Sequence, residues 1–186
     1  MQRSDDIDGD IILRHQEGDP LALGELDKRY RSRVYAYCSR LLNGDHQAED
    51  IVQTTFTKAF LSIHTLQTPG AFRGWLFTIA RNEVYGAIRS KDRNAPGPMT
   101  EDVFDPETPI EILDRMHTVE AVDNGLSKLR LPYREIIILR HFEGMTYAEI
   151  AALTGNSIAT IESRLHKARR ALAKLLKPLW DERRAE

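Results

Sequence analysis

Cysteine is nearly absent from this chain of 186 residues, which contains only Cys38. One cysteine forms no intramolecular disulfide, so the sequence predicts a reducing setting, the cytoplasm. Long apolar runs are missing as well, because no run approaches the roughly 18 residues that a membrane span needs. The acidic residues 1–10 contain no apolar stretch of the kind that a signal peptide has. We therefore expect a cytoplasmic protein without a membrane span.

Spacings typical of metal sites and enzymes are also lacking. The histidines show no paired spacing with each other or with Cys38, so we expect no metal site and no cofactor. The sequence has no glycine-rich phosphate loop and no nucleophile elbow. Glu49 and Asp50 resemble a carboxylate pair, but sequence neighbours on a helix do not face each other. These absences favour a protein that is not an enzyme and has no catalytic residues.

Alternation of apolar and polar residues, which marks a half-buried strand, is absent between the turn signals. Apolar residues instead recur three and four positions apart, as on one face of an α-helix, so the sequence predicts an all-α fold. Asn43 and Gly44 predict the end of the first such helix, and Asp45 predicts the cap of the next. The expected apolar stripes are Leu26, Tyr30, Val34, Tyr37 and Leu41; Ile51, Val52, Phe56, Ala59, Phe60 and Ile63; and Phe72, Leu76, Ile79, Ala80 and Ile88.

Residues 94–109 contain four prolines and no helical period, which is typical of a flexible linker. The sequence thus predicts two small helical domains, residues 1–93 and residues 110–186, joined by this linker. In the second domain, residues 110–129 and 133–142 are expected to form the first two helices.

The net charge of −2 hides four alternating blocks. Residues 1–27 carry a net charge of −6 and residues 92–123 carry −7, whereas residues 28–91 and residues 124–178 each carry +6. The two basic blocks indicate two surfaces that bind a polyanion. Solvated helix faces would give the same pattern, so charge alone does not decide between the two interpretations.

A helix-turn-helix is predicted near the C-terminus. Thr146 and Glu149 have the spacing of a capping box, in which each side chain bonds the other residue's backbone amide. Gly155 suits the left-handed residue that ends a helix, and Ser157 is a favourable cap for the next one.

The second helix of this motif has two separate faces. Its expected buried stripe is Ile158, Ile161, Leu165, Ala168 and Leu172. Small hydroxyls and an arginine near its start suit base edges in a major groove, and cations farther along suit phosphates. A surface helix that binds no DNA is the alternative. The expected DNA-binding residues are Ser157, Thr160, Ser163, Arg164, Lys167 and Arg170.

Residues 131–172, from Leu-Pro-Tyr-Arg-Glu through the capping box to Arg-Arg-Ala-Leu, resemble the promoter-binding C-terminal domain of the extracytoplasmic-function group of bacterial sigma factors. In that family the second helix reads the minus-thirty-five promoter element. The resemblance spans both helices, the turn and the helix before them.

Residues 48–60 resemble the sigma-factor helix that docks on the clamp of RNA polymerase. The resemblance implies that Asp50, Gln53 and Phe56 bind polymerase, with Phe56 as an apolar anchor. The alternative is that the aromatic residues of this helix are core, and for Phe60 we favour the core.

Residues 70–82 and 87–93 resemble the family's element for recognising and melting the minus-ten region. Opening DNA requires a pocket for an unstacked base, which the loop at residues 66–74 would form, and cations along the single strand. Trp75 and Phe77 are expected either to stack on bases or to be core, with at least one of them in the core. The expected DNA-binding residues here are Arg73, Arg81, Asn82, Arg89 and Lys91.

One position departs from the family pattern. Members usually carry an aspartate four residues after the asparagine, where this chain has Gly86. Glycine costs roughly 1 kcal/mol of helix stability relative to alanine, so we expect a less rigid helix at this point.

The resemblance implies a sigma factor that binds core RNA polymerase and directs promoter recognition and DNA opening in a stress response. Its implied partners are core polymerase, promoter DNA as an upstream duplex and a single-stranded minus-ten element, and an anti-sigma factor. The alternative is an autonomous helix-turn-helix regulator, which needs a dimer interface to pair half-sites. Residues 110–129 are too short and polar for a convincing one. The sequence does not reveal the promoters, the regulon or the inducing signal.

Overall fold

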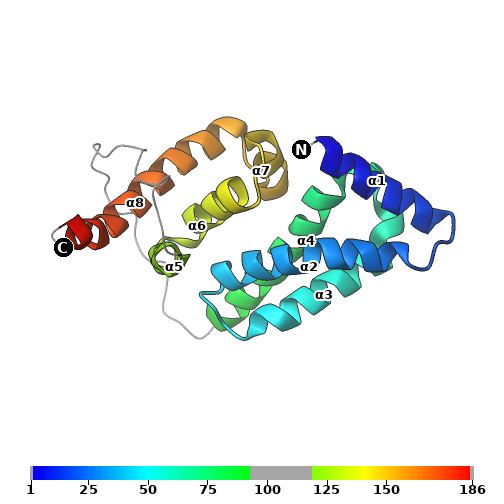
Figure 1. Cartoon of the computed structure of the whole chain (residues 1–186), viewed down its shortest axis with the longest axis horizontal. Coiled ribbons are helices and arrows are strands. Elements are labelled where there is room, and N and C mark those ends of the chain that lie inside the picture. Colours follow the sequence, from blue (N-terminus) through cyan, green and yellow to red (C-terminus); the bar gives the residue numbers. More distant parts are fainter. Residues whose placement is uncertain (1, 93–118, 185–186) are drawn as a thin grey trace. The chain divides into compact units, whose positions relative to one another are not determined.

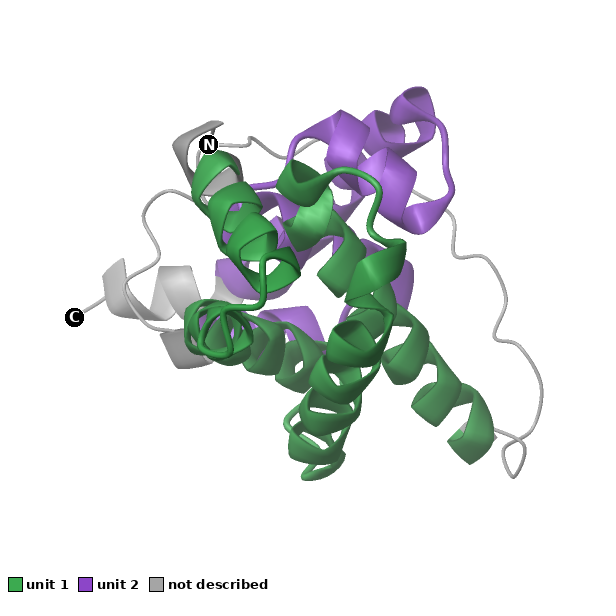
Figure 2. Cartoon of the chain, turned by 90° about the vertical axis from the view of Figure 1, so that its right-hand side faces the viewer, with its two compact units in different colours: residues 1–93 green, residues 94–186 purple. Residues whose placement is uncertain are grey.

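The computed structural model describes the backbone of residues 2–92 and 119–184 and the side chains of residues 6–91 and 121–177. The chain divides into two compact units, Met1–Arg93 and Asn94–Glu186 (Figure 2). The described residues form α-helices and short helical turns and contain no strand, which confirms the all-α expectation. The predicted linker, residues 94–109, lies outside the described residues.

Four α-helices build unit 1 (Figure 1). In chain order, the elements are α1 (Gln2–Gln16), α2 (Ala22–Leu41), α3 (Gln47–Ser62), the single turns η1 (Ile63–Thr65) and η2 (Pro69–Ala71), and α4 (Phe72–Asp92). Helix α4 contacts the other three helices, and α2 contacts all of them as well. The apolar stripes expected on α2 and α3 are buried, apart from the half-buried Phe60.

Pairs of aromatic rings join α2 to α4 in the core of unit 1. The rings of Tyr30 and Phe72 meet edge to face with centroids 5.5 Å apart, and those of Tyr37 and Phe77 do so at 5.3 Å. All four side chains are fully buried. Edge-to-face contacts add to the apolar burial of such rings, so α2 fixes the course of α4 from its first residue onward.

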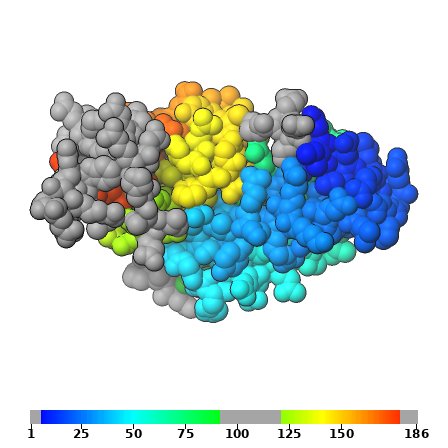
Figure 3. Space-filling model, in the orientation of Figure 1, coloured from blue at the N-terminus to red at the C-terminus, as the bar shows by residue number. Residues whose placement is uncertain are grey.

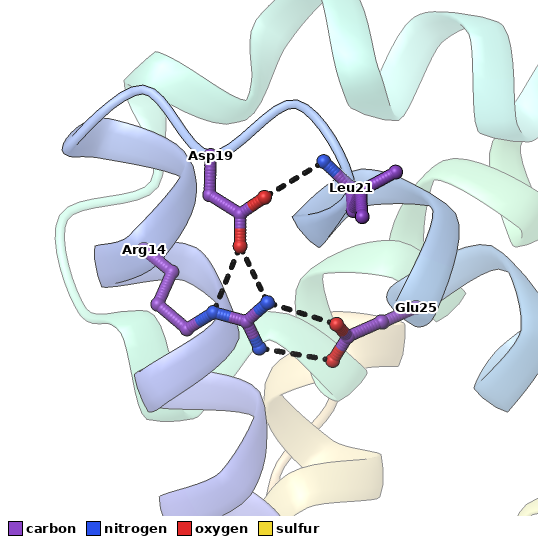
Figure 4. A network of polar contacts seen from close by, with 4 residues as sticks. All are labelled: Arg14, Asp19, Leu21 and Glu25. Atoms are coloured by element: carbon purple, nitrogen blue, oxygen red, sulfur yellow. Dashed lines mark hydrogen bonds and ion pairs between the residues drawn. The ribbon is translucent and has the colours of Figure 1, made fainter.

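Helix α1 was not predicted from the sequence. It packs on α2, with Ile11 and Ile12 buried, and covers one face of unit 1 together with α2 (Figure 3). In the turn between the two helices, the Arg14 guanidinium donates to the carboxylates of both Asp19 and Glu25 (Figure 4). These hydrogen bonds raise the pKa of Arg14 and lower the pKa of Glu25.

In unit 2 the elements are α5 (Val119–Ser127), α6 (Leu131–Ile137), the π-helical turn η4 (Ile138–Phe142), α7 (Tyr147–Thr154) and α8 (Ile158–Arg184). Helix α8 contacts α5, α6 and α7. The predicted helix at residues 110–129 is described only from residue 119, where α5 begins. The predicted helix at residues 133–142 corresponds to α6 together with η4.

Two features hold α5 in place within unit 2. The buried Arg134 donates to the carbonyl oxygens of Leu126, Ser127 and Leu129 at the end of α5, and desolvation lowers its pKa. A Cβ atom on Gly125 would lie 2.8 Å from Leu172 Cδ1, so a larger residue there would require the leucine side chains of α8 to shift. Together these contacts fix the helix that precedes the helix-turn-helix.

Candidate nucleic-acid and protein interfaces

The helix-turn-helix forms with the geometry that its sequence predicts. Thr146 Oγ1 accepts from the Glu149 amide at 3.2 Å, and Glu149 Oε2 accepts from the Thr146 amide at 2.7 Å, which completes the capping box. Helix α7 ends at Gly155, whose φ of 69° is left-handed. Ser157 Oγ then accepts from the Thr160 amide at 3.1 Å and caps α8. The turn is therefore defined by local bonds on both sides.

The first turns of α8 present a mixed polar surface. Ser157, Ser163 and Lys167 are exposed, and Thr160 and Arg164 are half-buried. Glu162 and His166 are also exposed on these turns, although neither is among the DNA-binding residues expected above. Glu162 and His166 are four residues apart and so lie on one face of the helix, which is the sequence signal that groups them. Both side chains can make hydrogen bonds to a base edge.

Two positions of α8 differ from expectation. Ile158 was predicted in the buried stripe but is 47% exposed, at the first residue of α8. Arg170 was predicted as a phosphate contact but is only 8% exposed. Leu172, Ala173 and Leu176 are also buried in this part of α8, so the prediction of a direct phosphate contact by Arg170 is wrong.

Helix α4 carries the second candidate nucleic-acid surface. Asn82, Arg89 and Lys91 are exposed on it. Arg81 is half-buried, with its guanidinium 4.3 Å from the centroid of the Tyr85 ring. Lys91 pairs with Asp45, and this interaction lowers the pKa of the Asp45 carboxyl. The surface thus offers an amide, three cations and an aromatic ring along one helix.

The beginning of α4 is mostly internal. Arg73 was predicted as a phosphate contact, but it is 5% exposed because it shares the buried stripe with Phe77 and Ala80, so a direct phosphate contact is excluded in this structure. Phe77 is fully buried and Trp75 is half-buried, in line with the expectation that at least one is core. Helix α4 continues through Gly86 without a break.

The outer face of α3 is a candidate protein interface. Asp50 and Gln53 are exposed there, next to Thr54. Phe56 was predicted as the apolar anchor of this interface, but it is 2% exposed and packs edge to face on Phe60 with centroids 5.7 Å apart. Phe56 lies on the buried side of the helix together with Ile51 and Val52, so its assignment as a direct contact to polymerase is wrong.

Within the described residues, no helix is long and apolar enough to cross a membrane. The same part of the chain contains no group of three or more histidine, cysteine, aspartate or glutamate side chains arranged to hold a metal ion.

Both units match known protein families. The family model for sigma-70 region 2 matches residues 26–94, and the model for sigma-70 region 4 matches residues 120–172. The chain is 32% identical over 184 residues to the RNA polymerase sigma factor NccH of Alcaligenes xylosoxydans xylosoxydans, covering 91% of this chain and 95% of that protein. It is 27% identical over 179 residues to the ECF RNA polymerase sigma factor SigW of Bacillus subtilis, covering 90% of this chain and 96% of SigW.

Two solved structures share the fold. The sigma factor RpoE in complex with the anti-sigma factor NepR from Bartonella quintana aligns with a TM-score of 0.69 at 29% identity, over 84% of this chain and 98% of that chain. CnrH in complex with the cytosolic domain of CnrY aligns with a TM-score of 0.68 at 26% identity, over 92% of this chain and 97% of that chain.

Proposed function

Because the chain belongs to the extracytoplasmic-function sigma factors, we propose that its two units read separate elements of one promoter for RNA polymerase. A sigma factor directs promoter recognition by the polymerase, so the chain is not an autonomous regulator. We assign no catalytic residue to it, since the polymerase performs the chemistry of transcription. The observation that carries the proposal is that family regions on both sides of the linker match this one chain.

We assign the upstream, minus-thirty-five element to the start of α8. Helix-turn-helix proteins place the N-terminal part of the second helix in the major groove. Arg164 lies about two turns after the cap at Ser157, where a guanidinium reaches guanine O6 and N7. Thr160, Ser163 and Glu162 flank it, and the exposed Lys167 contacts phosphate.

The minus-ten element is assigned to α4 and the loop before it. Asn82 contributes a donor and an acceptor for one base edge, while Arg81, Arg89 and Lys91 lie along the strand backbone. The loop at residues 66–74 exposes Gln67, Thr68, Gly70 and Ala71 and receives the unstacked base.

Core polymerase is assigned to the outer face of α3. Asp50 and Gln53 are polar groups at the rim of this contact, and the buried Phe56 supports the helix from inside. One of the two similar structures holds the sigma factor RpoE with the anti-sigma factor NepR, and the other holds CnrH with the cytosolic domain of CnrY. We propose that this chain is likewise held inactive by an anti-sigma factor, in the cytoplasm where the polymerase acts.

In vitro transcription with purified core polymerase and a panel of promoters tests the proposal. Addition of the chain should start transcription from a subset of the panel, and the Asp50→Ala/Gln53→Ala double variant should lose core affinity while remaining folded. Asp10→Ala/Gln16→Ala on α1 is the matched control, because it removes the same two residue types from exposed positions. Equal core affinity for both variants and the parent would reject the assignment of α3, and no promoter-dependent transcription would reject the function.

A further inference from the structure

Helix α1 touches the loop that the proposed function assigns to the unstacked base. It packs on η2 (Pro69–Ala71), which forms the middle of that loop. Gly9 lies close to this turn, since a Cβ atom there would lie 3.8 Å from Pro69 Cβ and 3.9 Å from the Gly70 amide nitrogen. Alanine therefore fits at this position in ordinary contact, whereas a longer side chain would displace the loop.

The residue before Gly9 ties α1 to α2. Asp8 is fully buried, and its carboxylate accepts from the Tyr30 hydroxyl and lies 2.9 Å from Arg29 Nε. Burial, followed by the bond to Asp8, raises the pKa of Tyr30 to about 12, so this hydroxyl stays protonated and donates. A buried carboxylate is tolerated only with such partners. The packing of α1 against α2 therefore depends on Asp8.

Tyr30 connects the same carboxylate to Phe72, which directly follows η2 in the loop. Its ring packs edge to face on Phe72, the first residue of α4, with centroids 5.5 Å apart. The loop therefore contacts Gly9 at η2 and Tyr30 at Phe72. Asp8 is hydrogen-bonded to Tyr30 and is the sequence neighbour of Gly9, so it is linked to both contacts. The Arg14, Asp19 and Glu25 contacts tie the far end of α1 to α2 (Figure 4).

We propose that Asp8 is a positioning residue for promoter melting, which acts through α1 and Tyr30 to hold residues 66–74 in the shape that receives one unstacked base. The proposal rests on the proposed function, because it requires that this loop bind the base. It assigns a task in DNA recognition to a residue that contacts no DNA.

Binding of single-stranded DNA to the holoenzyme tests the proposal. The probe is a fluorescent oligonucleotide that carries the minus-ten element of a promoter on which the parent is active, with each base replaced in turn. Asp8→Asn removes the charge, Tyr30→Phe removes the hydroxyl but keeps the ring on Phe72, and Gly9→Leu pushes on the loop with the ion pair intact. Gly9→Ala is the matched control. Core affinity and upstream-duplex preference are measured for every variant.

We expect the first three variants to lose on the order of tenfold in discrimination at one base position, with the other positions, core affinity and upstream preference unchanged. Gly9→Ala should match the parent. An unchanged preference profile in folded Asp8→Asn and Gly9→Leu would overturn the proposal. An equal loss at all positions together with lost core affinity would also overturn it, because it would show a general role in folding. A parent holoenzyme without base preference would instead reject the proposed function itself.

Discussion

The ion pair between Lys91 on α4 and Asp45 makes a prediction at the scale of single residues. Asp45 Oδ1 also accepts a hydrogen bond from the backbone amide of Gln47 at 3.0 Å. Asp45 therefore stabilises the start of α3 and at the same time forms the ion pair with Lys91. The Lys91 contact lowers the pKa of Asp45, so the stabilisation is present at neutral pH and is lost only as the pH falls through the lowered value. Near pH 7 the pair therefore competes with a phosphate for Lys91.

The Asp45→Asn substitution keeps the acceptor for the Gln47 amide and removes the charge. We expect the holoenzyme to bind minus-ten single strand more tightly by up to about fivefold at low salt, with a steeper salt dependence. Asp27→Asn is the control, because it removes one carboxylate from the Arg31 pair on α2 instead. Fluorescence anisotropy at several salt concentrations measures the affinity of both variants for the single strand. An equal gain in affinity for the two variants would mean that release of Lys91 from Asp45 does not cause it.

Exposure explains which site residues the sequence predicted and which it did not. Ser163 and Lys167 lie on the face opposite the apolar stripe of α8, so the helical period placed them at the surface, whereas Asn82 was assigned through the family resemblance and is exposed as well. Arg73 and Arg170 were assigned to phosphates by their charge, but both fall on buried faces. Where a helix packs on several neighbours, its buried face is wider than its apolar stripe, and the width depends on contacts that one sequence does not reveal.

At the scale of elements, we propose that α8 makes two kinds of DNA contact, and two substitutions separate them. Arg164→Ala should lower transcription and relax preference at one or two upstream base pairs, by about 1–3 kcal/mol of discrimination. Lys167→Ala should weaken binding about equally on every sequence and reduce the salt slope by about one phosphate contact. Lys167 takes this place instead of Arg170 because it is exposed.

A promoter library with randomised upstream bases, transcribed with parent and variant holoenzymes, compares the two profiles. Matching preferences for Arg164→Ala and the parent would show that Arg164 does not read bases. The remaining candidates would then be Thr160, Glu162, Ser163 and His166. Leu165→Met, a volume-conserving change in the buried stripe, controls for altered packing of α8.

Helix α1 shows why one element escaped prediction. Its apolar residues Ile7, Ile11, Ile12 and Leu13 are few, and a surplus of acidic residues surrounds them. Ile7 and Leu13 are exposed, so the buried face of α1 rests on two isoleucines and on the partners of Asp8. From the sequence alone, an aspartate such as Asp8 is expected at the surface. Its burial becomes evident only from its contacts with the Tyr30 hydroxyl and Arg29 in the structure.

At the scale of the whole molecule, the arrangement of two helical units on either side of a linker was predictable, because long helical periods and a cluster of prolines are strong local signals. The family assignment was predictable for the same reason, since its motifs lie on those helices and in the turn at Gly155. The roles of individual cations were less predictable, because they depend on burial and pairing in three dimensions.

Alternating charge also predicts a behaviour of the whole chain. Residues 1–27 carry −6, and the structure shows Asp6, Asp10 and Glu17 exposed on and after α1, whereas Asp8 is internal. Exposed carboxylates repel DNA phosphates at distances within a Debye length, about 10 Å at 0.1 M salt. We therefore expect the free chain to bind duplex DNA weakly, in part because of these three groups.

The Asp6→Asn/Asp10→Asn/Glu17→Gln variant changes the formal net charge from −2 to +1 and leaves the core of unit 1 intact, which deletion of α1 would not. Its affinity for a random duplex should rise by a factor on the order of five at low salt. Near 1 M salt the Debye length is about 3 Å, so the difference from the parent should vanish there. The control variant Asp6→Glu/Asp10→Glu/Glu17→Asp keeps every charge and should bind like the parent. A gain that persists at 1 M salt, or that the control shares, would mean that the substitutions act through the structure of α1 and not through its charge.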